Sequence, residues 1–548
     1  MPNESLPLPA ADATPGADLD AALEAYNRQN GIAPPPPPPL EPGVKLLGKY
    51  TVLRMLDPDS GGAELVLCAH EGVQYFARAY AESFAVDPES AARQRSVDSP
   101  LVVRLVETGA RDGRPVEILP YYKNGSLQGN VLGEQPLTET VIPTLNEALR
   151  ALRGAGIVHG RLSPACLLVS DDEKALAVAC PGLRPAAEWA AQAPEYAAPE
   201  VFRGILGESA DYYSMGVTLF ELFCGYAPFV NLGPEEIEAL VRARRIPFPE
   251  RVPARLKALI TGLIGGFSEA GEPVRWGYDE VRRWLNGEDP ALPDAPKDDE
   301  PVPVMPGYLF LRETYTDPAA LARAFALRWE EGKREVFSGR LSAHLRGCLP
   351  ELARICREAE AAANQQSDRA DIIFWQLLCR LNPRTRDFFW KNWIFDSLPA
   401  LGRAVLEDLW EGDDSRLSFC ESLLAEKALS AYAARFAPGS EALKKAAAAI
   451  EASHDREAQG GTDMRRTLYL MGYLLSGQKL LRLGGEQFRS VGELADDMRG
   501  VLKKSYPDFE ALCHRLVDED GSLDPQLESW LIALGKTNEL DQWRGALG

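Results

Sequence analysis

The chain has 548 residues, of which 45% are hydrophobic and 25% charged, and 80 Asp and Glu against 59 Lys and Arg give a net charge of −21. This composition is ordinary for a globular protein, and it excludes the clustered basic surface of a nucleic-acid-binding protein, so we expect no nucleic-acid partner. No apolar run approaches the ~18 residues that span a bilayer, and the start of the chain lacks the pattern of a signal peptide.

Residues 1–45 are rich in proline, alanine and aspartate, and residues 34–39 form an unbroken proline run. Such a run favours polyproline II and builds neither helix nor sheet. We therefore expect a disordered tail here. It is either a stiff spacer or a ligand for an aromatic-lined groove on another protein.

From residue 46 onward the sequence first favours strands and then helices. Short runs rich in β-formers, separated by turn residues, predict strands at 50–53, 64–68, 74–77, 102–106 and 116–119. A short helix is expected near 88–97, and further helices at 138–153, 212–223, 234–244 and 253–264. This order indicates a two-lobed α+β domain over residues 46–287.

Residues 288–306 carry many prolines and acids without periodicity, and we interpret them as a linker. Residues 307–548 are mainly helical by periodicity and are interpreted as an interaction region. Four tryptophans are expected in its helical core, namely Trp375, Trp390, Trp393 and Trp410. Two segments share a pattern of short strand, turn and helix, and we interpret them as related modules flanking a helical middle. They run from Tyr308-Leu309-Phe310 to Gly339-Arg340-Leu341 and from Leu481-Arg482-Leu483 to Gly521-Ser522-Leu523.

Four segments of the α+β domain carry distinctive motifs. They read Ile157-Val158-His159-Gly160-Arg161-Leu162-Ser163-Pro164-Ala165-Cys166-Leu167-Leu168, Pro194-Glu195-Tyr196-Ala197-Ala198-Pro199-Glu200, Asp211-Tyr212-Tyr213-Ser214-Met215-Gly216-Val217 and Arg275-Trp276-Gly277-Tyr278-Asp279-Glu280-Val281. In order and spacing they resemble the catalytic loop, the end of the activation loop, the central buried helix and the closing segment of eukaryotic-type protein kinases. The resemblance covers about half of the chain. It implies a kinase-like fold held by His159, Asp211 and a buried Glu200–Arg275 ion pair.

The same resemblance places the family's proton-accepting Asp and its two metal-holding residues at Arg161, Cys166 and Cys180. Arginine offers no acceptor and stays protonated, so it cannot serve as a base. A thiol is a poor ligand for Mg²⁺, which prefers oxygen. The resemblance therefore implies a degenerate member, a pseudokinase, with no metal site and no conventional phosphotransferase activity.

The nucleotide side of the cleft also departs from the family. Gly61 and Gly62 keep a glycine pair of the phosphate-cradling loop, but without the family spacing. Arg78 lies near the place of the family's strand lysine, Glu89 is the candidate for its helix partner, and Leu119 falls at the gatekeeper position. We expect no cofactor beyond weak, metal-independent ATP binding.

These observations favour a regulatory protein that scaffolds or switches protein partners of unknown identity. The nine cysteines form no CxxC pair, which favours reduced thiols and a cytoplasmic location, and the Ala-, Arg- and Pro-rich composition suggests a bacterial source. One alternative is a nucleotide-dependent transferase or atypical protein kinase with a rearranged site, built on Arg78, Arg161 and the Asp171-Asp172-Glu173 cluster. Another is that the C-terminal half is the functional part and the kinase-like half only a docking platform.

Overall fold

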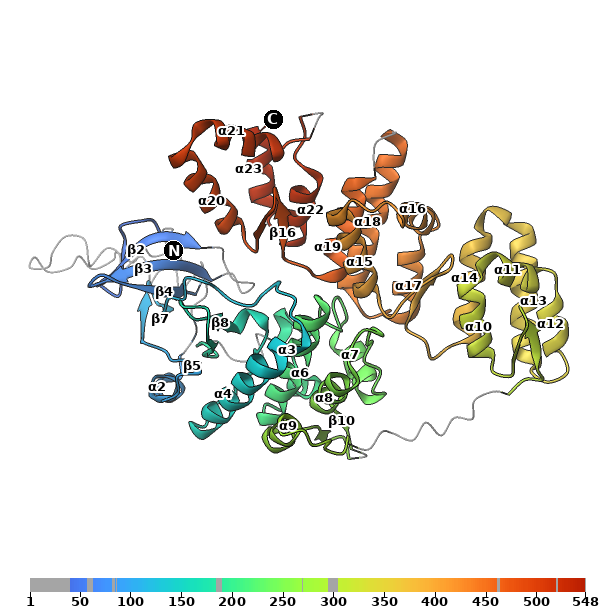
Figure 1. Cartoon of the computed structure of the whole chain (residues 1–548), viewed down its shortest axis with the longest axis horizontal. Helices are drawn as coiled ribbons and strands as arrows, with labels where there is room; N and C mark the ends of the chain where they lie inside the picture. The colour runs from blue at the N-terminus through green and yellow to red at the C-terminus, as the bar shows by residue number, and fades with distance from the viewer. Residues whose placement is uncertain are drawn as a thin grey trace, which may run out of the picture.

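The computed structural model describes residues 40–56, 63–80, 84, 86–183, 190–268, 270–293, 304–460, 464–518 and 521–547. A two-lobed α+β domain forms the N-terminal half, and a mostly helical region forms the C-terminal half (Figure 1). The predicted fold class is therefore confirmed.

The N-lobe is built on a six-stranded sheet in the order β1-β2-β3-β4-β7-β6. Its strands are β1 (Lys45–Leu46), β2 (Tyr50–Leu56), β3 (Glu64–His70), β4 (Val73–Ala79), β6 (Glu107–Arg111) and β7 (Arg114–Pro120), and its helix is α2 (Pro88–Ser96). Order begins earlier than predicted, because Leu40 is buried in the core of this sheet and the Gly43 N–H donates to the Val52 carbonyl at 2.8 Å. Residues 40–45, which were predicted to belong to the tail of residues 1–45, are therefore part of the N-lobe. Residues 1–39 lie outside the described part.

The C-lobe is mainly helical and is arranged around α6, which is buried along most of its length. Its helices are α3 (Glu134–Pro136), η1 (Leu137–Val141), α4 (Ile142–Gly154), η2 (Pro164–Cys166), η3 (Pro199–Arg203), α6 (Glu208–Cys224), α7 (Pro234–Arg242), α8 (Ala254–Ile264) and α9 (Tyr278–Leu285). Its strands are β5 (Val102–Val103), β8 (Leu167–Val169), β9 (Leu176–Ala179), β10 (Gly266–Phe267) and β11 (Pro273–Val274). The lobe extends past the predicted limit at residue 287, because Trp276 Nε1 donates to the Ala291 carbonyl at 3.0 Å.

The C-terminal half holds three modules, not the two that were predicted. Module 1 contains β12 (Tyr308–Phe310), β13 (Glu313–Tyr315), α10 (Pro318–Leu327), α11 (Trp329–Phe337), α12 (Arg340–Leu345), α13 (Pro350–Gln365), η4 (Ser367–Arg369) and α14 (Ala370–Leu381). Module 2 contains β14 (Phe388–Trp390), β15 (Trp393–Phe395), α15 (Leu398–Glu411), α16 (Leu417–Ala425), α17 (Ala428–Phe436), α18 (Glu441–Gly460) and α19 (Arg465–Ser476). Module 3 contains β16 (Leu481–Leu483), β17 (Glu486–Phe488), α20 (Val491–Lys504), α21 (Tyr506–Arg515), α22 (Pro525–Ala533) and α23 (Thr537–Leu547).

Each module opens with a hairpin of two three-residue strands joined by a two-residue turn. Both turn residues have positive φ in every module, as a tight hairpin turn of this length requires. The helix that follows is capped by the side chain of Asp317, Ser397 or Ser490, each of which accepts from backbone N–H groups in the first turn. The common design is therefore set by local geometry more than by sequence identity.

The middle hairpin escaped the sequence prediction because its residues mimic a buried helix. Trp390 and Trp393, expected in the helical core, instead belong to strands β14 and β15. The turn between them is Lys391-Asn392, which adopts positive φ without the glycines that mark the turn of module 3. Trp375 and Trp410 lie on helices, as expected.

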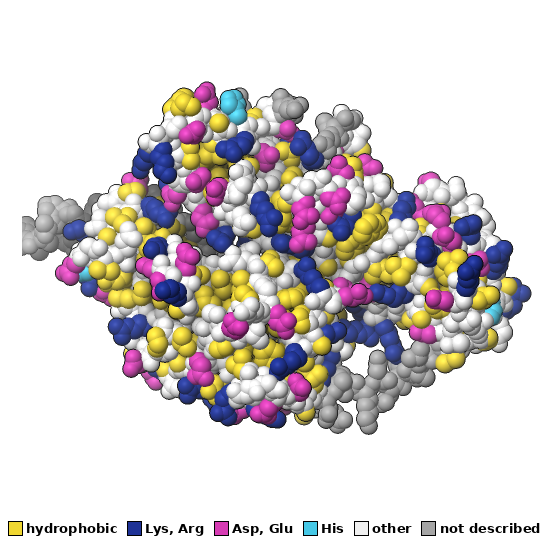
Figure 2. Space-filling view, in the orientation of Figure 1, with side chains coloured by type: hydrophobic (Ala, Val, Ile, Leu, Met, Phe, Trp, Pro, Cys, Tyr) yellow, Lys and Arg dark blue, Asp and Glu magenta, His cyan; other side chains and the backbone are white. Residues whose placement is uncertain are grey.

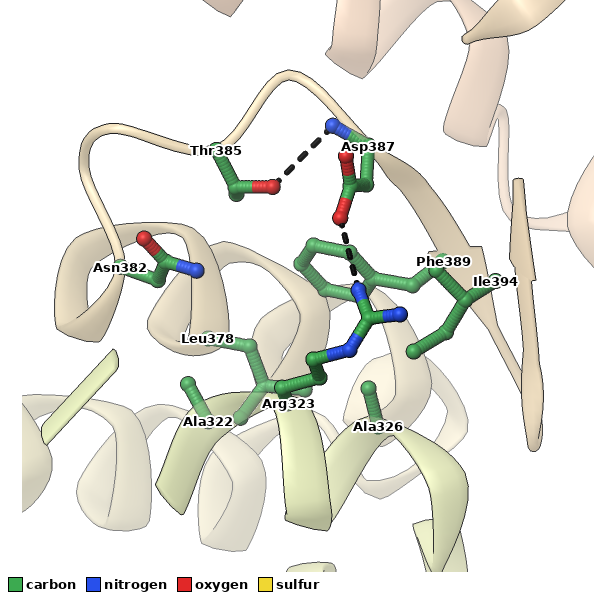
Figure 3. Close-up of a pocket in the computed structure, with 9 residues that line it drawn as sticks. All are labelled: Ala322, Arg323, Ala326, Leu378, Asn382, Thr385, Asp387, Phe389 and Ile394. Carbon is green, nitrogen blue, oxygen red and sulfur yellow. Dashed lines mark hydrogen bonds and ion pairs between the residues drawn. The ribbon is translucent and has the colours of Figure 1, made fainter. Parts of the chain in front are cut away.

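Consecutive modules pack through these hairpins. The Asn392 side-chain oxygen accepts from the backbone N–H of Trp329 at 2.8 Å, and the ring centres of Trp329 and Trp390 lie 5.4 Å apart. A small cavity of about 10 Å³ remains at the same junction, beside the Arg323–Asp387 ion pair of 3.0 Å (Figure 3). It has room for about one water molecule, so we interpret it as part of the module interface.

The two halves also touch directly, beyond the linker that joins them. Module 2 lies on the C-lobe, where Asn231 Nδ2 donates to the Leu474 carbonyl at 2.7 Å and Glu236 accepts from the Gly439 N–H at 2.9 Å. Residues 288–293 belong to the C-lobe, and Met305 is buried in module 1, so the predicted linker of residues 288–306 narrows to 294–303, which the structure does not describe.

Module 3 returns to the N-terminal domain and contacts both of its lobes (Figure 1). Asp496 on α20 forms an ion pair with Arg54 on β2, and Arg489 donates to Asn130 of the C-lobe at 2.6 Å. The C-terminal end of the chain is therefore placed across the two lobes.

None of the helices among the described residues is long and apolar enough to cross a membrane. Basic and acidic side chains are interspersed over the visible face of the described part, without a broad area of either sign (Figure 2).

Candidate functional site

The loop between α4 and β8 is held from below by the central helix α6. Asp211 is buried, and its carboxylate accepts from the backbone N–H groups of His159 at 2.8 Å and Gly160 at 2.7 Å. His159 Nε2 in turn contacts the Ala179 carbonyl at 2.9 Å. These contacts fix the backbone that presents the next residue, Arg161, toward the cleft between the lobes.

Arg161 reaches the turn that follows β9. Its guanidinium Nη1 donates to the Pro181 carbonyl at 3.2 Å. Gly182 in this turn has a φ of +86°, and a Cβ atom placed on it would lie 3.2 Å from Nη1 of both Arg161 and Arg78. Two guanidinium groups thus converge on the turn that carries metal-binding chemistry in an active kinase.

Arg78 lies on β4 and faces the cleft, where it pairs with a strand residue. Its register partner on β7 is Glu117, and the two side chains form an ion pair. The Glu117 side chain is fully buried and also accepts from the Tyr80 hydroxyl at 3.3 Å. The expectation that Glu89 is the partner was wrong, because Glu89 is exposed and forms an i,i+4 pair with Arg93 at 3.0 Å.

Helix α2 reaches the site through a neutral side chain. Gln94 is buried, and its Nε2 donates to the Gly182 carbonyl at 2.9 Å. The helix is therefore joined to the cleft turn by a hydrogen bond and not by an ion pair with the strand arginine.

Cys166 follows the loop and is buried next to Ser163. Its thiol donates to the Arg161 carbonyl at 3.3 Å, and the Ser163 hydroxyl lies 3.8 Å from the sulfur. Burial disfavours the thiolate, but the hydrogen bond and charge of His159 outweigh it, so the pKa of Cys166 is lowered to about 6. A soft sulfur stands where the family holds a hard Mg²⁺ ligand.

Cys180 and Leu119 lie together in an apolar cluster between the lobes. Burial, reinforced by the charge of Glu117, raises the pKa of Cys180 to about 12, so the thiol stays protonated. Leu119 is buried at the end of β7, where the gatekeeper was predicted. Gly61 and Gly62 lie outside the described residues.

The Glu200–Arg275 pair is present as predicted. It is bidentate, with distances of 2.7 and 3.1 Å, and both side chains are 1% exposed. Arg275 also donates to the Ser209 carbonyl at 3.0 Å, and its guanidinium lies 5.3 Å from the centre of the Tyr213 ring. The pair joins η3 to the segment before α9 and closes the C-lobe.

The acidic cluster does not enter the cleft. Asp171, Asp172 and Glu173 are exposed in the turn between β8 and β9, where Asp172 accepts from the Ser170 hydroxyl at 2.6 Å. Among the residues that the structure describes, no group of three or more His, Cys, Asp or Glu side chains is placed to hold a metal ion. The guanidinium groups of Arg78 and Arg161 and the thiols of Cys166 and Cys180 do not fit magnesium, and the Glu117 carboxylate of the cleft is paired with Arg78.

Three residues of the cleft were missed from the sequence: Tyr80, Gln94 and Glu117. The signal for Glu117 was a single acid inside the apolar run from Val116 to Leu119, which we had interpreted only as a strand. A buried strand seldom holds an unpaired carboxylate, so a basic partner on the neighbouring strand was the inference to draw.

Residues 88–266 match the family model described as the protein kinase domain. The match begins at α2, after the strands that carry the departures from the family in the N-lobe. CBL-interacting protein kinase 11 of Oryza sativa subsp. japonica is 34% identical over 204 residues, which are 34% of this chain and 40% of that protein. Probable serine/threonine-protein kinase 2 of Plasmodium falciparum is 30% identical over 155 residues, which are 26% of this chain and 30% of that protein.

The chain thus spans less than half the length of these curated relatives. Among solved structures, the PknI kinase domain of Mycobacterium tuberculosis aligns with 45% of this chain and 99% of its own, at 20% identity and a TM-score of 0.35. The family match and the sequence relatives together support the eukaryotic-type kinase superfamily, and residues 88–266 of this chain are similar to protein kinase domains.

Proposed function

We propose that this chain is a pseudokinase that regulates or scaffolds protein partners. The observation that carries the proposal is the replacement of the phosphoryl-transfer groups: Arg161 extends its guanidinium to the Pro181 carbonyl from the place of the family's base. Cys166 and Cys180 replace the metal-holding residues. Because positioning and charge stabilisation by these groups supply almost all of the catalysis in phosphoryl transfer, their loss removes the reaction while the fold remains.

The regulatory part of the proposal is supported by how the halves meet. Module 3 contacts the N-lobe through Asp496 and the C-lobe through Arg489. A partner that binds the modules therefore changes the relation between the lobes, and a ligand in the cleft changes the modules in return.

A phosphotransfer assay tests the catalytic part. With labelled ATP and Mg²⁺ or Mn²⁺, we expect no incorporation of the γ-phosphate into the protein or generic substrates. An Arg161→Ala variant is the matched control, because it alters the cleft and leaves the Glu200–Arg275 pair intact. Incorporation by the parent protein that is lost in this variant contradicts the proposal.

Melting experiments test nucleotide binding separately. We propose weak binding of ATP without metal, since Arg78 and Arg161 place positive charge near Gly182. A ligand at 100 times its Kd stabilises a protein by about 2.7 kcal/mol, so saturating ATP produces a visible shift. The shift is expected to be the same with and without Mg²⁺ and smaller in the Arg161→Ala variant. A shift that requires Mg²⁺ argues against it.

The convergence of Arg78 and Arg161 also favours a second candidate, a nucleotide-dependent transferase with a rearranged site. The exposed position of the Asp171-Asp172-Glu173 turn speaks against it, because no acidic group of that turn reaches the two arginines. Intact-mass measurement after incubation with ATP separates the candidates. An added phosphate or nucleotide that depends on Arg78 supports the transferase, and an unchanged mass supports the pseudokinase.

A further inference from the structure

A cavity of about 250 Å³ lies between the C-lobe and module 2, away from the cleft. Its walls are mainly apolar: Val230, Leu240 and Pro247 on the C-lobe side face Leu398, Tyr432 and Phe436 on the module 2 side. This volume approaches the roughly 300–1,000 Å³ that is typical of small-molecule sites. Both halves of the protein contribute to it, so an occupant contacts both.

Positive charge gathers at one part of the wall. Arg245 and Arg386 line the cavity. Arg245 donates to the Arg384 carbonyl at 2.9 Å, and Arg386 donates to the Thr385 carbonyl at 3.1 Å. Arg435 nearby likewise donates to a backbone carbonyl, that of Cys379, at 2.7 Å. Burial, together with repulsion from Arg245 and Arg435, lowers the pKa of Arg386.

The two acids on the wall do not compensate these arginines. Glu236 accepts from the Gly439 N–H at 2.9 Å and forms no ion pair with Arg245 or Arg386 among the described residues. Asp396 forms no ion pair with either arginine in the described part of the chain, and burial, followed by the charge of Asp387, raises its pKa. Within the residues that the structure describes, Arg245 and Arg386 thus have no carboxylate partner. An apolar site with such guanidinium groups favours an amphipathic anion.

We propose that this cavity binds a small amphipathic carboxylate, such as a medium-chain acyl or an aryl carboxylate. The apolar part fills the space between Leu240, Leu398 and Phe436, and the carboxylate pairs with Arg245 and Arg386. Because the ligand contacts both halves, it stabilises the kinase domain and module 2 in their present arrangement. This site does not depend on the proposed pseudokinase function.

Binding to the full chain is measured by calorimetry with three probes of equal chain length: octanoate, octanamide and octylammonium. Charge-assisted hydrogen bonds are worth about 1.5–3 kcal/mol, so octanoate is expected to bind at least ~10-fold more tightly than octanamide. Octylammonium is expected not to bind. Equal affinity for octanoate and octanamide, or no binding of octanoate, overturns the proposal.

Variants locate the site. Replacing both Arg245→Gln and Arg386→Gln is expected to lower octanoate affinity to that of octanamide and to leave octanamide binding unchanged. Ala243→Trp, at an exposed position on the cavity wall, fills the space and abolishes binding of both probes.

Matched controls lie just outside the cavity: Arg242→Gln on α7, which pairs with Glu238, and Ala442→Trp on the exposed face of α18. Both are expected to bind octanoate as the parent does. Octanoate affinity that falls in the controls as much as in the cavity variants overturns the assignment to this cavity.

Discussion

Two arginine–glutamate pairs with buried carboxylates lie in the two-lobed N-terminal domain, one in the C-lobe and one in the cleft. Arg275 and Glu200 join segments of the C-lobe that are far apart in the chain, and both side chains are 1% exposed. Arg78 and Glu117 join the neighbouring strands β4 and β7, and here too the carboxylate is fully buried. An arginine–glutamate pair therefore closes the C-lobe in one place and joins two strands at the cleft in the other.

The difference lies in what each pair connects. The C-lobe pair fixes η3 against the start of α9, as the family resemblance implied. The cleft pair holds a strand to a strand, and Glu89, the acidic residue of helix α2, pairs with Arg93 on its own helix. Among the described residues, that helix contacts the cleft through Ala91, which packs in the apolar cluster of Leu119 and Cys180, and through the hydrogen bond from Gln94 to the Gly182 carbonyl. Arg78 is therefore held within the sheet. In the described part of the chain, no ion pair joins Arg78 to helix α2, so the pairing of Arg78 does not depend on the position of this helix.

The largest effect is expected from removal of the C-lobe pair. Arg275→Ala leaves Glu200 buried without its partner, which usually costs about 3–5 kcal/mol. Urea unfolding monitored by fluorescence measures the loss. Arg283→Ala is the matched control, because Arg283 forms a 2.7 Å pair with Glu288 in which both side chains are about half exposed; such pairs contribute roughly 0–1 kcal/mol. Equal losses in the two variants contradict the structural role of Arg275.

Removal of one partner of the cleft pair is expected to destabilise the protein somewhat less, and replacement of both partners is expected to restore most of the stability. Arg78→Ala leaves the buried Glu117 carboxylate without its cation and destabilises the protein by about 3 kcal/mol. Replacing both residues, Arg78→Met with Glu117→Leu, is expected to restore most of this loss, because an apolar pair of similar size removes the buried charge altogether. A double variant as unstable as the single one shows that the pair holds more than the two strands together.

The two ion pairs also differ in how far the sequence predicts them. The C-lobe pair and the anchoring Asp211 were accessible because fixed motifs place them, and the same motifs predict the replacements at Arg161, Cys166 and Cys180. The Arg78–Glu117 pair was accessible only in part: the single acid in an apolar strand signals a basic partner, but strand register decides which residue that partner is, and one sequence does not specify the register. The middle module was missed because Trp390 and Trp393 have the apolar character of a helix core, and only the backbone of Lys391 and Asn392 reveals the turn.

The smallest effect is the change in a pH profile that is expected from the charge of Lys479, in the segment just before module 3, on a carboxyl group of the C-lobe. Burial raises the pKa of Glu221 on α6 to about 7 from 4.5, although a hydrogen bond from Tyr196 and the charge of Lys479, just before β16, act in the opposite direction. The folded state therefore holds this proton up to about pH 7, whereas the unfolded chain releases it near pH 4.5. The folded state binds more protons in this window, so Glu221 reduces stability as pH rises through it, by about 3 kcal/mol in total for a pKa that is raised by about 2.5.

Denaturant unfolding across this pH window checks the sign. Glu221→Gln is expected to remove the decline that the parent shows between these pH values. Lys479→Met removes a positive charge that lowers the pKa of Glu221, so the decline is expected to extend to higher pH, whereas Lys503→Met, at an exposed position on α20, leaves the profile unchanged. A Lys479→Met profile identical to the parent's means that module 3 does not act on the charge at Glu221. The pH response at Glu221 would then arise within the C-lobe alone, and the electrostatic contact between the halves would be confined to other sites, such as the Arg54–Asp496 ion pair.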